Sequence, residues 1–139
     1  MDHYLFISSQ DAQDLHPENT STDFTIELPR TYELTGDWEV ALKEIELRIK
    51  EDLVYICSDI CEESYAHGSL VPILQSARRE RKNKAVFHFT DPYYLPIRTH
   101  ILTKVGIIIR GRDLQSLPKD KTVVYCTLHL RKKSCGPRQ

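Results

Sequence analysis

Residues 37–49 read Asp-Trp-Glu-Val-Ala-Leu-Lys-Glu-Ile-Glu-Leu-Arg-Ile, and this stretch contributes most to the prediction of the fold. Apolar side chains take every second position in each half, with a change of parity between the halves: Trp38, Val40 and Leu42, then Ile45, Leu47 and Ile49. Two-residue alternation is typical of a strand with one buried face. A change of parity within a strand indicates a β-bulge or a sharp bend. Several good helix formers leave a helix as the alternative, but we expect a bulged strand.

Seven other segments have strand composition and are bounded by turn residues. Pro29 is expected to end the strand that starts at residue 23, because proline cannot donate to the ladder. Pro72 interrupts residues 69–76 and marks them as an edge strand. Residues 11–23 are polar and are expected to form a long loop. The eight expected strands are 3–8, 23–28, 37–49, 53–60, 69–76, 85–90, 101–110 and 122–131.

This pattern predicts an all-β fold, an eight-stranded antiparallel single jelly-roll sandwich. In that topology one sheet contains the first, eighth, third and sixth strands in this order, and the other contains the second, seventh, fourth and fifth. We expect one domain over residues 1–132 and a mobile basic tail over 133–139, which lacks acidic side chains. The expected core includes Phe24, Ile26, Trp38, Val40, Ile107 and Leu128.

Charge is distributed unevenly along the chain. Residues 1–67 contain 16 acidic and four basic residues, whereas residues 68–139 contain four acidic and 15 basic residues. The basic half could bind nucleic acid. Alternatively, the two halves neutralise each other within one fold, because every neighbouring pair in the expected sheets joins a strand of the acidic half to one of the basic half. The composition is that of a soluble globular protein, and the N-terminal residues do not resemble a signal peptide.

The four cysteines are interpreted as free thiols, buried or half-buried, and not as a disulfide framework or a metal site. Cys57 and Cys61 are separated by three residues, which fits zinc knuckles poorly, and no second ligand pair has matching spacing. The other two are Cys126 and Cys135. We therefore expect no metal ligands.

No arrangement of residues predicts catalysis or a cofactor, and we expect the protein not to be an enzyme. The six histidines are scattered, and His88 and His129 fall within expected strands, where a hydrogen-bonded structural role is the common one. Tyr93 and Tyr94, in a loop between two prolines, could form a stacking platform for a sugar or peptide. Tyrosines in such loops more often anchor the loop over the core.

Two basic stretches are dense enough to contact phosphates or an acidic neighbour, although they lack interleaved aromatic residues for base stacking. A solvated turn and a solvated tail are the alternatives. The residues concerned are Arg78, Arg79, Arg81, Lys82 and Lys84, and then Arg131, Lys132 and Lys133.

Several motifs resemble the minor capsid (penton) proteins of Polinton/Maverick elements and of the related adintoviruses. The most specific is Leu-Pro followed by Leu-x-Gly-x-Trp-Glu-Val-Ala-Leu-x-Glu-Ile over residues 28–45, after a polar loop with Pro17-Glu-Asn19. Residues 91–97 and 127–132 are also similar. The motif and core positions are Leu28, Pro29, Gly36, Trp38, Val40, Leu42 and Ile45.

The resemblance implies a structural capsid protein, a single jelly roll that forms pentamers at the vertices of an icosahedral shell. Its expected partners are further copies of itself, the major capsid protein of the same shell and packaged DNA, with no membrane and no small-molecule substrate. It would be made in the host cytoplasm, assembled in the nucleus and located in the virion. The main alternative is a β-sandwich binding module, lectin-like or similar to a trimeric ligand, that recognises a carbohydrate or a protein. A binder of single-stranded nucleic acid is the third possibility.

Overall fold

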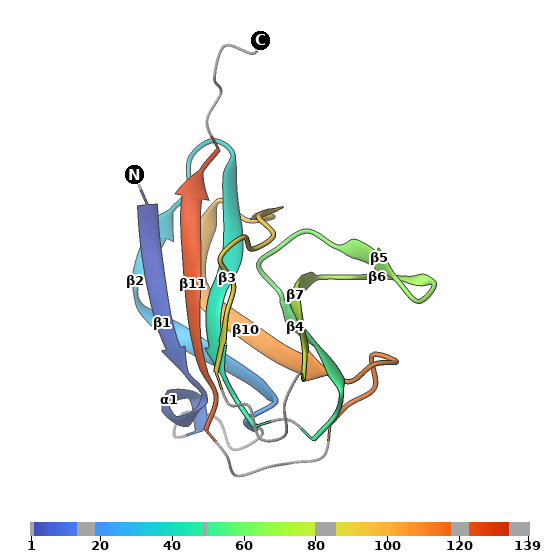
Figure 1. Cartoon of the computed structure of the whole chain (residues 1–139). Helices are drawn as coiled ribbons and strands as arrows, with labels where there is room; N and C mark the ends of the chain where they lie inside the picture. The colour runs from blue at the N-terminus through green and yellow to red at the C-terminus, as the bar shows by residue number, and fades with distance from the viewer. Residues whose placement is uncertain (1, 14–18, 49, 80–85, 118–122, 134–139) are drawn as a thin grey trace.

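A computed structural model of the chain describes residues 2–13, 19–48, 50–79, 86–117 and 123–133. Two antiparallel sheets pack against each other to form a sandwich, and a short hairpin projects from one side (Figure 1). The elements are β1 (Asp2–Ser8), α1 (Ser9–Gln13), β2 (Asp23–Glu33), β3 (Trp38–Glu46), β4 (Leu53–Ser58), β5 (Ser64–Ala66), β6 (Ser69–Val71), β7 (Ile73–Arg78), β8 (Val86–His88), β9 (Leu95–Pro96), β10 (Ile101–Arg110) and β11 (Tyr125–Lys132). The predicted all-β antiparallel sandwich is confirmed.

The first sheet has the order β1-β11-β3-β8, and β9 also pairs with β3. The second sheet has the order β2-β10-β4-β7, while β5 and β6 pair only with each other. The eight strands of these two orders overlap the eight segments expected from the sequence.

The described residues contain eleven strands instead of the eight expected. The segment 69–76, expected as one edge strand, is divided at Pro72 into β6 and β7, because proline has no N–H to donate. β6 then turns back on β5 through His67 and Gly68, whose φ angles are +49° and +83°. Two successive positive φ angles are those of a type I′ hairpin turn. β9 is a two-residue strand within the loop expected at 91–96.

Pro29 does not end β2, which continues to Glu33. β2 is an edge strand, and its register with β10 is interrupted between Leu102 and Lys104, opposite the residues around Pro29. An edge strand with a bulge accommodates a proline without losing a ladder hydrogen bond. The beginning of the expected loop at 11–23 is also different, because residues Ser9–Gln13 form the short helix α1. No helix among the described residues is long and apolar enough to cross a membrane.

The stretch 37–49 forms a strand over Trp38–Glu46, so the helical alternative is wrong, and Ile49 lies outside the described residues. The predicted bulge is confirmed. Leu128 of β11 faces Leu42 while Thr127 faces Glu44, so Lys43 is the extra residue. This insertion moves Ile45 to the buried face.

Most of the expected core is buried between the sheets. Phe24, Trp38, Val40, Ile107 and Leu128 are buried, but Ile26 is only partly buried. It lies on an edge strand and lines a shallow groove between β1 and β2. Among the motif positions, Leu42 and Ile45 are also buried and Leu28 is partly buried, whereas Pro29 and Gly36 are exposed.

The turn before β3 explains why the motif contains Gly36 and Trp38. Gly36 has a φ of +94°, a conformation that L side chains rarely adopt. This turn places the carbonyl of Thr35 3.1 Å from Nε1 of Trp38, which donates a hydrogen bond to it. The indole can then enter the core with its only polar group paired.

The two oppositely charged halves of the chain are joined throughout the fold. Each of the eight strand pairings described connects a strand from residues 1–67 with a strand from residues 68–133. Two ion pairs, Glu39–Arg131 and Asp52–Arg112, also connect the halves, as do two contacts between a carboxylate and a histidine, Asp2–His129 and Glu44–His88. The charge asymmetry is therefore accounted for, in large part, within the sandwich.

Candidate functional site

A polar cluster occupies the outer face of the β1-β11-β3 sheet. Because side chains alternate along a strand, the register brings together those that point away from the core. His129 of β11 lies between Tyr4 of β1 and Ala41 of β3, and Arg131 lies between Asp2 and Glu39. His129 has a partner on one neighbouring strand, Asp2 on β1, and Arg131 has a partner on the other, Glu39 on β3.

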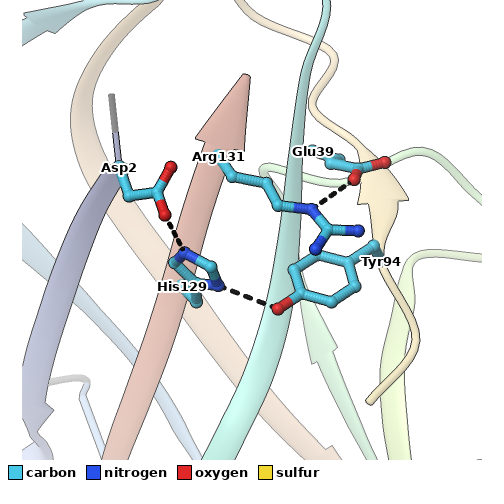
Figure 2. Close-up of polar contacts among 5 residues, drawn as sticks. All are labelled: Asp2, Glu39, Tyr94, His129 and Arg131. Atoms are coloured by element: carbon cyan, nitrogen blue, oxygen red, sulfur yellow. Dashed lines mark hydrogen bonds and ion pairs between the residues drawn. The ribbon is translucent and has the colours of Figure 1, made fainter. Parts of the chain in front are cut away.

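Figure 2 shows how the cluster is connected. Nε2 of His129 is 3.0 Å from Oδ2 of Asp2, and Nδ1 of His129 is 2.8 Å from the hydroxyl of Tyr94. The neutral imidazole with a proton on Nε2 satisfies both contacts, donating to the carboxylate and accepting from the hydroxyl. Nε of Arg131 donates to Oε2 of Glu39 over 2.6 Å, and its guanidinium lies 3.4 Å from the centre of the Tyr94 ring.

Tyr94 belongs to a loop that several contacts hold against the sheet. The backbone N–H of Tyr93 donates to Oε1 of Gln75 on β7, and Leu95 pairs with Val40 of β3. The N–H of Ile97 donates to the carbonyl of Trp38. Tyr94 is half-buried under Arg131, whereas Tyr93 is 63% exposed. Tyr94 therefore anchors the loop, as the commoner interpretation of the tyrosine pair predicted.

The hydrogen bond from His129 lowers the pKa of the Asp2 carboxyl, and this effect exceeds the opposing effect of desolvation. An acid with a depressed pKa in the folded state stabilises the fold at neutral pH. That contribution is lost as the pH falls through the folded-state pKa. At another surface position, the hydrogen bond from Arg112 lowers the pKa of Asp52 in the same way.

Asp2, His129 and Tyr94 are hydrogen-bonded in series. His129 is only 7% exposed, and both of its ring nitrogens are hydrogen-bonded. Arg131 covers the Tyr94 ring. These contacts join the 92–95 loop to the sheet. His88 is exposed, and its Nδ1 lies 2.8 Å from Oε1 of Glu44.

A groove of about 580 Å³ lies on the far side of this loop, between it and the β5–β6 hairpin. Four tyrosines line it, together with His67 and small or apolar residues, and no acidic or strongly basic side chain contributes to the lining. The hydroxyl of Tyr55 on β4 is 3.2 Å from Nε2 of His67, which ties the hairpin to the sheet. The tyrosines are Tyr55, Tyr65, Tyr93 and Tyr94.

The described residues of the two basic stretches are not brought together. Lys132 pairs with Trp38, the first residue of β3. Arg78 pairs with Leu53, the first residue of β4. Because β4 follows the end of β3, these two basic residues lie near opposite ends of β3. Arg131 is engaged by Glu39 and Tyr94, so it is not a free surface cation. Three others lie outside the described residues: Arg81, Lys82 and Lys84.

Lys133, assigned to the mobile tail by the sequence, is attached to the sandwich. Its backbone N–H donates to the carbonyl of Asp37 over 2.7 Å, which extends the attached chain one residue beyond β11. Residues 134–139, with Cys135, lie outside the described residues.

Three thiols are buried and unpaired, as predicted: Cys57, Cys61 and Cys126. Burial raises the pKa of Cys57 to about 11 and those of Cys61 and Cys126 to about 12. A thiol in such surroundings stays protonated and behaves as a small apolar side chain. Among the described residues, no group of three or more His, Cys, Asp or Glu side chains is placed to hold a metal ion.

Comparisons with known protein families and with curated proteins find no match to this chain.

Proposed function

We propose that this chain is a structural capsid protein, a penton-like single jelly roll that forms pentameric rings at the vertices of an icosahedral shell. Its role is structural and not catalytic. Its partners are further copies of itself, the major capsid protein of the shell and packaged DNA, and its location is the virion, after assembly in the nucleus.

The observation that carries this proposal is the order of strands in the two sheets. The orders β1-β11-β3-β8 and β2-β10-β4-β7 support a jelly roll built on two four-stranded sheets. β5, β6 and β9 are then additions to that framework. The resemblance of residues 28–45 to penton proteins supports the same proposal. The buried residues of this motif belong to the hydrophobic core, and Gly36 belongs to the turn that precedes β3.

The polar cluster supports a structural role. A hydrogen-bonded imidazole and a stacked guanidinium fasten a loop to the sheet, and a rigid outer surface favours a repeated contact because less ordering is needed on association.

A β-sandwich binding module remains the second candidate, and the tyrosine-lined groove favours it. Aromatic side chains with hydroxyl groups can stack on a neutral sugar or on an extended peptide. Such a module would bind its ligand as a single copy or as a trimer, without forming five-membered rings.

Negative-stain imaging of the purified protein distinguishes the two candidates. Rings with five-fold symmetry are expected for the vertex protein. Isolated particles or three-fold particles, together with saturable binding of an oligosaccharide, would favour the binding module and contradict the capsid proposal.

A further inference from the structure

The sandwich has two flanks of different character. β1 and β2 are the edge strands at one flank, and both line the same shallow groove. β7 and β8 are the edge strands at the other, where the β5–β6 hairpin and the 92–95 loop also lie (Figure 1). We call these the β1–β2 flank and the β7–β8 flank.

The two flanks differ in charge because acidic and basic strands alternate across both sheets. β1 and β2 together contain four acidic residues and one arginine. β7 and β8 contain one arginine and no acidic residue. Alternation through four strands therefore leaves a net acidic edge at β1 and β2, and an edge at β7 and β8 that carries Arg78 and no acid. Charges of opposite sign guide two such surfaces together.

Exposed apolar side chains are concentrated at the same flanks. On β1, Phe6 is 79% exposed and Tyr4 is 52% exposed. Near the groove of the opposite flank, Tyr65, Leu70 and Tyr93 are between 63% and 78% exposed. Aromatic side chains gathered on an otherwise polar surface mark a contact with another protein.

We infer that the β1–β2 flank of one copy docks against the tyrosine-lined groove of the next copy, with Phe6 seated between the β5–β6 hairpin and the 92–95 loop. This inference rests on the proposed ring. The contact joins two different surfaces, as a closed ring requires. A contact between the β1–β2 flanks of two copies would instead place acidic strands against acidic strands, which would repel each other.

Two variants test the contact. Phe6→Glu removes the inserted ring and adds a charge, but leaves the groove intact. Tyr65→Glu places a charge in the groove and leaves β1 intact. Both side chains are exposed, so both variants are expected to keep the circular dichroism and the melting temperature of the wild type. Ile101→Gln, at a 61% exposed position on β10, is the control, because it removes an exposed apolar side chain without placing a like charge opposite Glu33 of β2.

Each variant alone should give monomers of 16.2 kDa by native mass spectrometry, while the control should form rings like the wild type. An equimolar mixture of Phe6→Glu and Tyr65→Glu should give dimers and nothing larger. In that dimer, Phe6 of the groove variant enters the intact groove of the other chain, and no second contact can extend the assembly.

Rings of wild-type mass from either variant, or rings restored by the mixture, would overturn this contact while leaving the proposed ring itself in place; the groove would then be available to another ligand. A wild-type protein that is monomeric at every concentration would contradict the proposed function and this inference together.

Discussion

The hydroxyl of Tyr94 lies 2.8 Å from Nδ1 of His129, which is only 7% exposed, and this contact joins the 92–95 loop to the centre of the β1-β11-β3 sheet. Because Asp2 engages the other ring nitrogen, the imidazole has one tautomer that satisfies both neighbours. The same tyrosine carries the guanidinium of Arg131 on its ring.

Tyr94→Phe should lower the free energy of unfolding by about 1–3 kcal/mol, because it leaves Nδ1 of a buried histidine without a partner. The ring stays in place for Arg131, so the loss reports the hydroxyl alone. Urea denaturation measures it. Tyr93→Phe, at the exposed neighbouring position, is the control and should change stability by less than about 0.5 kcal/mol. Equal effects of the two substitutions would contradict the anchoring role.

Trp38→Ala should lower the free energy of unfolding by about 3–5 kcal/mol, since the indole is in the core. Trp38→Phe should cost less because it keeps most of the buried ring. As the chain has one tryptophan, fluorescence reports this position directly. A native emission spectrum like that of free tryptophan would show that the core assignment is wrong.

The buried thiols make stability depend on alkaline pH. Burial raises the folded-state pKa of Cys126 to about 12 from an ordinary 9.0, so the folded state retains a proton that the unfolded state releases. The contribution of this thiol to the free energy of unfolding is complete below pH 9 and is lost as the pH rises toward 12. Between these limits the free energy of unfolding falls by about 1.4 kcal/mol per pH unit for each such thiol.

Urea denaturation between pH 8 and pH 10.5 measures this slope in the wild type and in Cys126→Ala. The variant is less stable at pH 8 because it leaves a small cavity, but its stability should decline less steeply with pH. Parallel declines in the two proteins, or rapid reaction of Cys57, Cys61 or Cys126 in the native protein with a disulfide reagent at pH 8, would be inconsistent with buried protonated thiols.

Deletion of residues 134–139 should change the free energy of unfolding by less than about 0.5 kcal/mol, because the backbone hydrogen bond of Lys133 to Asp37 is retained. Urea denaturation measures this change. Unfolding after the deletion would place the boundary of the fold further along the chain.

If the C-terminal cations bind packaged DNA, Lys132→Gln with Lys133→Gln should weaken DNA binding. It should also reduce the slope of log affinity against log salt by about two, because two fewer phosphates are neutralised. An unchanged slope would exclude these two lysines from DNA binding.

Much of the fold could be predicted because its determinants are local. Alternation in residues 37–49 identified β3, and the change of parity identified the bulge at Lys43. The alternating charge of neighbouring strands could also be expected, since it follows from the division of the sequence into an acidic and a basic half.

The rest depends on contacts between distant segments. The β5–β6 hairpin turns through His67 and Gly68, and the first of these residues is not one that usually signals a type I′ turn. Pro29 is compatible with β2 only because that strand is an edge with a bulge. The cluster on the outer face joins residues 35 and 127 positions apart, and its only local sign is the small Ala41 opposite His129.

The mass of the purified protein in solution tests the proposed vertex role most directly. Multi-angle light scattering over a range of concentrations should give a species of five times the 16.2 kDa of the chain. A monomer at every concentration, or a trimer alone, would contradict the proposed ring.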